Sequence, residues 1–140
     1  MKIAALIPVL LLTLTSAAQA AEPAGLRLVE SSAARGIADR RPEGAAERFP
    51  ADVGQVWAFV NIANTAEPTE IHQRWEHGGK VRFDAKLSVG KAAGWRTWSR
   101  HRIGAKDAGT WTVTTVGPDG TVLGTLAFEI EPASTPTAGR

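Results

Sequence analysis

The segment "GWRTWSRHRIG" at residues 94–104 gathers side chains that are well suited to binding. If it is a regular strand, alternate side chains share a face, and one face then carries Arg96, Trp98, Arg100 and Arg102. Guanidinium groups bind carboxylate, sulfate or phosphate in a two-point geometry, and an indole stacks on a sugar or a cation. This face is our candidate binding site for an anionic polysaccharide or an acidic protein partner.

The same pattern also has a purely structural interpretation. Trp98 would then lie beneath the arginine stems and stabilise the sheet through cross-strand packing. A β-bulge that turns both indoles inward is a further alternative. The exposure of Trp98 distinguishes these interpretations. On a regular strand the opposite face carries Trp95, Thr97, Ser99, His101 and Ile103.

Residues that could act in catalysis or bind a metal are poorly arranged. Ser99 and His101 share a face, but two residues along a strand are about 6–7 Å apart at the backbone. The G-x-S-x-G pattern of hydrolase nucleophiles is absent. His72 and His77 fall on opposite faces of a regular strand, so the histidines complete no zinc site. We therefore expect no catalytic residue, metal or cofactor, and a small hydrolase is the least favoured function.

The elements that would position these residues are short strands separated by turns. The run 80–90 is the clearest, since its apolar side chains, Val81 and Phe83 among them, alternate with polar ones such as Arg82. Residues 34–52 show no sustained alternation of apolar and polar side chains and predict a long loop that packs across an edge or a face of the sheet. The predicted strands cover 26–33, 54–64, 70–77, 80–90, 95–103, 110–116 and 121–131.

This spacing predicts an all-β fold, an antiparallel β-sandwich of about seven strands. The chain contains no cysteine, so disulfides cannot stabilise it and its apolar core must do so alone. We expect Trp57, Trp75 and Trp111 to fill the space between the two sheets, because indoles on central strands fill many sandwiches.

The first twenty residues predict a secretory signal peptide. Lys2 precedes an apolar run from Ile3 to Leu14, and Ala18-Gln19-Ala20 forms a small-residue cleavage site. The apolar run is shorter than the roughly 20 residues of a membrane-spanning helix, and an uncleaved anchor is the alternative. We expect a short linker at 21–25, the sandwich at 26–131 and a disordered tail at 132–140.

Charge argues against a nucleic-acid partner. The 16 basic side chains, of which Lys2 lies in the leader, nearly balance the 14 acidic ones, whereas nucleic-acid binders usually carry a strong basic excess. The leader instead predicts a periplasmic or extracellular location in a bacterium.

Several motifs together resemble the bacterial DUF2914 family, a domain of unknown function found in exported or membrane-anchored proteins. They are "RWEHGGKV" (74–81), "VGKAAGWRTWSRHRI" (89–103), "GTWTV" (109–113) and "DGTVLGTLAFEI" (119–130). The likeness extends upstream through "RFPADVGQVWAFVNI" and "DRRPEG" and covers roughly Leu26 to Glu131. It implies an immunoglobulin-like β-sandwich and brings no catalytic residues with it.

These observations predict a non-catalytic exported binding module. Its partner is expected to be a periplasmic protein or an anionic envelope polymer, held by the 96–102 face. The alternative is a structural accessory domain that pairs with another chain through an exposed strand edge.

Overall fold

The computed structural model describes residues 25–133, and these form β-strands without any helix. The predicted signal peptide, and with it nearly all of the linker and tail, lies outside the described residues. No described segment is a helix that is long and apolar enough to span a membrane. The strands are β1 (Leu26–Ala34), β2 (Gly36–Ala38), β3 (Arg41–Glu43), β4 (Arg48–Phe49), β5 (Gln55–Asn64), β6 (Thr69–His77), β7 (Lys80–Val89), β8 (Ala92–Arg102), β9 (Gly109–Val116) and β10 (Val122–Ile130).

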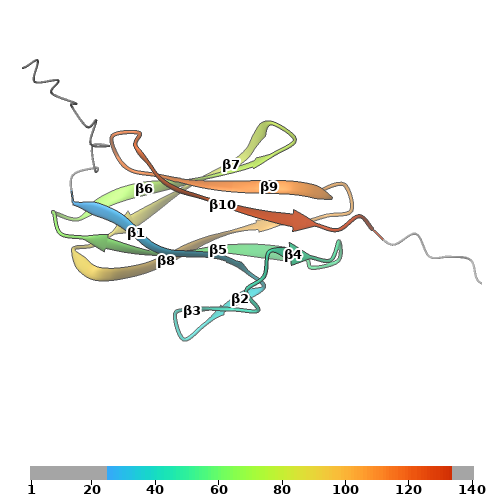
Figure 1. Cartoon of the computed structure of the whole chain (residues 1–140), viewed down its shortest axis with the longest axis horizontal. Helices are drawn as coiled ribbons and strands as arrows, with labels where there is room; N and C mark the ends of the chain where they lie inside the picture. Colours follow the sequence, from blue (N-terminus) through green and yellow to red (C-terminus); the bar gives the residue numbers. More distant parts are fainter. Residues whose placement is uncertain (1–24, 134–140) are drawn as a thin grey trace, which may run out of the picture.

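The strands form two facing layers (Figure 1). One is a three-stranded sheet in the order β1-β5-β8, and the other is a five-stranded sheet in the order β4-β10-β9-β6-β7. Pairing is antiparallel except between β4 and β10. The short β2–β3 hairpin lies on the outer side of the three-stranded layer (Figure 1) and contacts β5. The predicted all-β sandwich is therefore confirmed, while its immunoglobulin-like strand arrangement stays a prediction.

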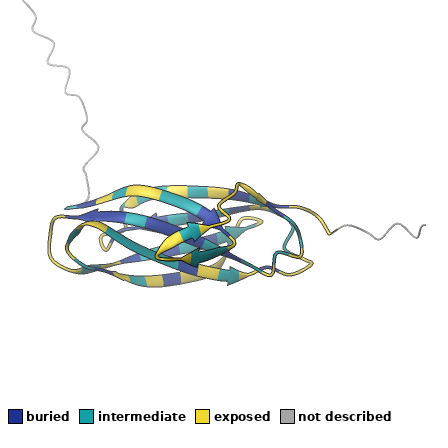
Figure 2. Cartoon of the chain, turned by 90° about the horizontal axis from the view of Figure 1, so that it is seen from below, coloured by how far each residue is buried: buried dark blue, intermediate teal, exposed yellow. Residues whose placement is uncertain are grey.

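The core lies between the layers because alternate side chains point inward. Figure 2 shows this as buried and exposed positions that alternate along the strands. Buried residues form two clusters, one around Trp75 and Trp111 and one around Ile62 and Ile71. Trp75 and Trp111 are each 0% exposed, so the prediction that these two indoles fill the core is confirmed.

The segment predicted as a long loop, 34–52, is more ordered than its composition indicates. It contains the β2–β3 hairpin and β4, which raise the number of strands in the described residues to ten, against about seven expected. The hairpin turns at Asp39 and Arg40, which both have positive φ (50° and 59°). Two such residues form the tight turn that matches the twist of paired strands. The prediction of a loop without strands was wrong because these strands are too short to show an alternating pattern, whereas the predicted packing of the segment against the sheet is confirmed.

Strand β7 departs from the regular alternation predicted for it. Gly78 and Gly79, at φ 59° and 75°, form the turn before it. The register with β6 then shifts, since Trp75 pairs with Phe83 but Glu76 pairs with Val81, which leaves Arg82 as the extra residue of a bulge. As a result Val81 is 54% exposed, and the guanidinium of Arg82 lies 5.4 Å from the Trp111 ring centroid. The predicted inward position of Val81 was therefore wrong, whereas Arg82 is exposed as predicted and also contacts a core indole.

Candidate binding face

Strand β8 has two chemically different faces. Its inner face contributes the buried Ser99 and, just beyond the strand, Ile103 (4% exposed) to the space between the sheets. Its outer face carries Arg96, Trp98, Arg100 and Arg102, as the alternation predicts. No bulge interrupts this stretch, because the register with β5 runs unbroken from Gln55–Arg102 to Ile62–Trp95.

Strand β5 places further side chains beside the outer face of β8. The register sets Trp57 opposite Arg100 and Phe59 opposite Trp98. The Arg100 guanidinium carbon lies 5.0 Å from the centroid of the Trp57 ring, within the range of a cation–π contact. We call the following set the arginine–indole face: Trp57, Arg96, Trp98, Arg100 and Arg102.

The prediction that Trp57 belongs to the core was wrong. Its neighbours Val56 and Ala58 are 0% exposed and point toward the other sheet, so alternation directs Trp57 outward, where it is half-buried. The sequence misled because β5 is apolar on both faces. Phe59 shares the outer face with Trp57 yet is only 1% exposed, and the β2–β3 hairpin contacts β5 on that side (Figure 1).

The exposure of the arginine–indole face is graded. Arg100 and Arg102 are exposed, whereas Arg96, Trp98 and Trp57 are half-buried. Trp98 is therefore neither buried like a core indole nor fully exposed. Its intermediate exposure leaves part of the residue accessible to solvent.

The arginines of this face form no ion pair within the part of the chain that the structure describes. None of Arg96, Arg100 and Arg102 forms an ion pair with a carboxylate of residues 25–133. On the outer side of the β6–β7 pair, by contrast, basic side chains do have acidic partners. Lys86 Nζ lies 3.1 Å from Glu70 Oε2, and Asp84 contacts two basic side chains. Three arginines without an ion-pair partner among the described residues thus lie together on the outer face of β8.

The inner face of β8 is occupied by a structural polar bridge. Trp75 Nε1 donates to Ser99 Oγ at 2.9 Å, and Ser99 donates in turn to the Gln73 side chain. Gln73 Nε2 donates to the carbonyl of Ala58 at 3.3 Å, so the bridge joins the two sheets. Ser99 is thereby held by Trp75 and Gln73, while the His101 ring packs against aromatic rings, including Trp75 at 5.8 Å between centroids.

The three histidines occupy different environments. His72 Nδ1 lies 2.8 Å from Asp84 on the outer side of β6, His77 stacks on Trp111, and His101 lies beside Trp75 and Phe83. Within the described part of the chain, no three His, Asp or Glu side chains are close enough together to hold a metal ion.

Sequence reasoning missed a second group, which closes one end of the sandwich. Arg82 donates to His77 Nδ1 at 3.1 Å and to Asp107 Oδ1 at 3.1 Å. Asp107 Oδ2 accepts from the Gly104 backbone N–H at 2.7 Å, and Trp111 Nε1 donates to the Asp107 carbonyl at 2.8 Å. The Gly104 hydrogen bond, followed by Arg82, lowers the pKa of Asp107. Only the bulge brings Arg82 here, and no local motif in the sequence indicates it.

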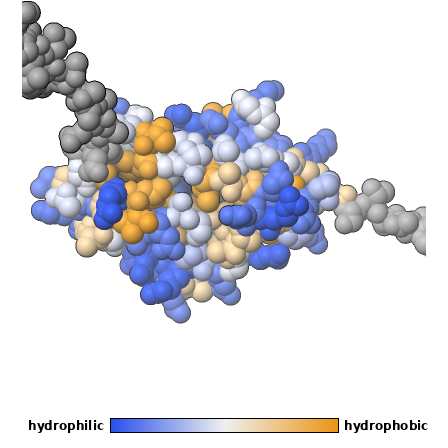
Figure 3. Space-filling view, viewed as in Figure 1, coloured by the Kyte–Doolittle hydropathy of each residue, from blue (hydrophilic) through white to orange (hydrophobic). Residues whose placement is uncertain are grey.

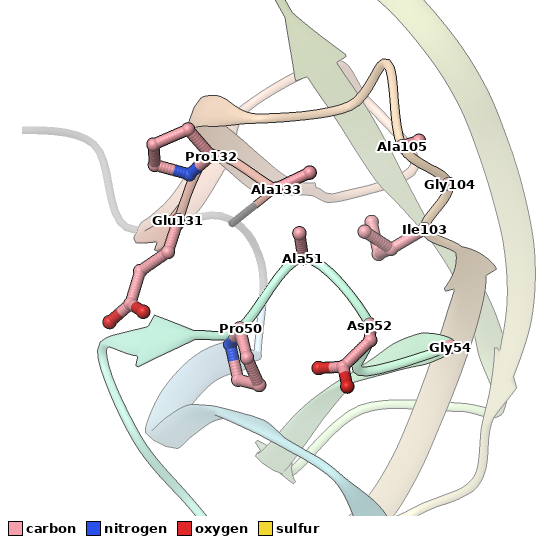
Figure 4. Close-up of a pocket in the computed structure, with 10 residues that line it drawn as sticks. All are labelled: Pro50, Ala51, Asp52, Gly54, Ile103, Gly104, Ala105, Glu131, Pro132 and Ala133. Carbon is pink, nitrogen blue, oxygen red and sulfur yellow. The ribbon is translucent and has the colours of Figure 1, made fainter. Parts of the chain in front are cut away.

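The surface has two further features, one hollow and one apolar patch. A hollow of about 510 Å³ opens at the end where β10 leaves the sandwich. Figure 4 shows Ile103 and Ala51 pointing into it and the Glu131 carboxylate pointing away. Figure 3 shows apolar surface over β1 and the start of β10, where Val29 and Val122 are 48% and 57% exposed. Neither feature brings polar groups together around a ligand, as a small-molecule site does.

Comparison with known proteins identifies the family. The model of the family described as "Protein of unknown function (DUF2914)" matches residues 68–130. Residues 68–130 belong to the DUF2914 family. The DUF2914 segment comprises β6 to β10 and includes four of the five members of the arginine–indole face. Strands β1 to β5 lie outside this match, although the sequence resemblance was predicted to begin at Leu26. No curated protein matches the chain.

Proposed function

We propose that this DUF2914 protein is an exported, non-catalytic β-sandwich that binds an anionic partner through the arginine–indole face. The partner is a protein of the periplasm or an anionic polymer of the envelope. The observation that carries the proposal is the set of three arginines, Arg96, Arg100 and Arg102, which share one face of β8 and form no ion pair with a carboxylate of the described residues. The leader pattern of residues 1–20 supports export.

The face is suited to binding because its groups are already ordered. Stacking on Trp57 restricts the Arg100 side chain, so less side-chain entropy is lost when an anion binds. Half-buried Trp57 and Trp98 add apolar surface next to the charges. Tryptophan and arginine are the residues that most often dominate binding energy at protein interfaces.

Charge reversal on this face tests the proposal. We expect the triple variant Arg96→Glu, Arg100→Glu, Arg102→Glu to lose retention on immobilised dextran sulfate and on immobilised polyglutamate. The control variant Lys80→Glu, Lys86→Glu, Lys106→Glu changes net charge equally at exposed positions elsewhere and should elute close to the wild type. Near-ultraviolet circular dichroism checks that both variants are folded. Equal loss in both variants would show that only bulk charge matters and would refute a defined face.

A second candidate is an accessory domain that pairs through a strand edge. It is favoured by the position of β8 at the end of the order β1-β5-β8, because an edge strand presents unpaired N–H and C=O groups. If edge pairing alone is responsible, blocking the backbone edge abolishes association and the arginine variants do not.

A further inference from the structure

The arginine–indole face lies on a strand that is also a sheet edge. β8 spans Ala92–Arg102 and pairs with β5 only, so its other side is free of a strand among the described residues. The polar backbone groups on that side are able to pair with an added strand. The charged face and the open edge are therefore parts of one surface.

An exposed aromatic side chain lies on the inner side of the unpaired edge of β8. β7 ends the order of the five-stranded sheet just as β8 ends that of the three-stranded sheet. Phe83 of β7 contacts His101 of β8 edge-to-face, with ring centroids 5.9 Å apart, and so joins the two edges. Phe83 is nevertheless 41% exposed. A strand beside β8 would thus meet positive charge on its outer face and an exposed aromatic ring on its inner face.

We propose that β8 binds an extended acidic–apolar segment of another protein as an added β-strand. This inference rests on the proposed function and specifies its partner. Side chains directly opposite one another on paired strands have Cβ atoms about 4.5–5.5 Å apart. Acidic residues at alternate positions of the segment would therefore lie opposite Arg96, Arg100 and Arg102. The intervening apolar residues would face inward and cover Phe83.

The arrangement favours a polypeptide strand over a polysaccharide. Backbone hydrogen bonds along the edge supply affinity that is independent of side chains, and alternate side chains supply specificity. A polysaccharide offers no regular row of N–H and C=O groups to this edge. Trp98 occupies the outward position between Arg96 and Arg100, so the segment should carry an uncharged residue there.

A designed peptide tests the inference. The probe is Glu-Val-Glu-Val-Thr-Val-Glu, which in antiparallel pairing runs from Arg102 to Arg96, and its reversed sequence covers parallel pairing. We expect one orientation to bind the full chain, measured by fluorescence anisotropy of a labelled peptide. A peptide of the same composition with its three Glu adjacent should bind at least about fivefold more weakly, because opposite charges gain energy only when they face each other.

Backbone methylation separates strand addition from simple charge attraction. Only alternate N–H groups of an added strand point toward β8. N-methylation of one alternate set of the peptide should therefore abolish binding, and methylation of the other set should leave it unchanged. Equal effects of the two sets would overturn the strand inference.

Protein variants complete the test. Phe83→Ser and Arg100→Gln should each weaken peptide binding several-fold, whereas Arg74→Gln, on the outer side of β6, should not. If dextran sulfate binds through the three arginines but the peptide does not, the strand inference fails and the proposed function stands. If neither probe depends on these arginines, both are refuted, and the charges serve only to keep the edge from pairing.

Discussion

Two arginines of this protein lie over tryptophan rings, but their surroundings differ. Arg82 lies 5.4 Å from the Trp111 ring centroid and Arg100 lies 5.0 Å from that of Trp57. Arg82 also donates to His77 and to Asp107, whose side chain is only 13% exposed. Arg100 is exposed and forms no ion pair with a carboxylate of the described residues.

This difference separates a structural arginine from an available one. Stacking on an indole orients a guanidinium group but leaves its charge uncompensated. Asp107 supplies the compensating charge for Arg82, and the pair ties the loop after β8 to β7. Arg100 is likewise oriented by a tryptophan ring, but no carboxylate of the described residues compensates its charge. An anionic group of a partner is therefore able to form an ion pair with Arg100, as Asp107 does with Arg82 within the fold.

The largest effect that we predict is the loss of stability when the tryptophan rings beneath the two arginines are removed. Trp111→Ala should lower the free energy of unfolding by about 3–5 kcal/mol, because Trp111 is 0% exposed and stacks with His77 and Phe128. Trp57→Ala should cost less than half as much, since Trp57 is half-buried on the outer face. Urea denaturation measures both. Equal losses would mean that the two arginine–indole pairs are both structural, and the comparison would fail.

Removal of each guanidinium group should give the next largest difference in stability between the two sites. Arg82→Gln should lower the free energy of unfolding by about 1–2 kcal/mol, because it leaves the mostly buried Asp107 carboxylate without its cation. Arg100→Gln should change it by no more than about 0.5 kcal/mol, as is usual for an exposed side chain. The same pair of variants should show the reverse order in binding to the acidic peptide. A stability loss at Arg100 as large as that at Arg82 would contradict its assignment as a binding residue.

The sequence predicted the features that depend on regular alternation. The β-sandwich was predicted from short runs in which apolar and polar side chains alternate. The division of β8 into two faces was predicted from the same alternation of side chains. The Gly78–Gly79 turn was also predictable, because its positive φ values favour glycine. The buried positions of Trp75 and Trp111 were predicted from the need of a cysteine-free chain for large apolar groups.

The features that sequence reasoning missed depend on contacts distant in the chain. Trp57 faces outward because Val56 and Ala58 occupy the inward positions, and an apolar run alone does not distinguish its two faces. The bulge at Arg82 is visible only in the shifted register with β6. The absence of an ion-pair partner for Arg100 among the described residues depends on which strands lie beside β8. That property is the basis of the proposed site, and the order of residues along one strand does not show it.

The smallest effect that we predict is a change in acid stability. The pKa of Asp107 is lowered, first by the Gly104 N–H and also by Arg82, so the charged form is favoured by folding. The stabilisation is present above the unfolded-state pKa, near the ordinary aspartate value of 3.8, and is lost as pH falls through the lower folded-state pKa.

Asp107→Asn retains an oxygen that can accept from Gly104 but removes the charge that faces Arg82. Its free energy of unfolding should therefore fall less steeply than that of the wild type between about pH 5 and about pH 2. The two proteins should converge at the acid end, where the wild-type carboxyl is protonated as well. Thermal denaturation across this range measures the effect, with Asp52→Asn at an exposed position as the control. Parallel curves would show that the Asp107 charge does not stabilise the Arg82 end. The contrast with Arg100 would then rest on packing and hydrogen bonds without a contribution from charge.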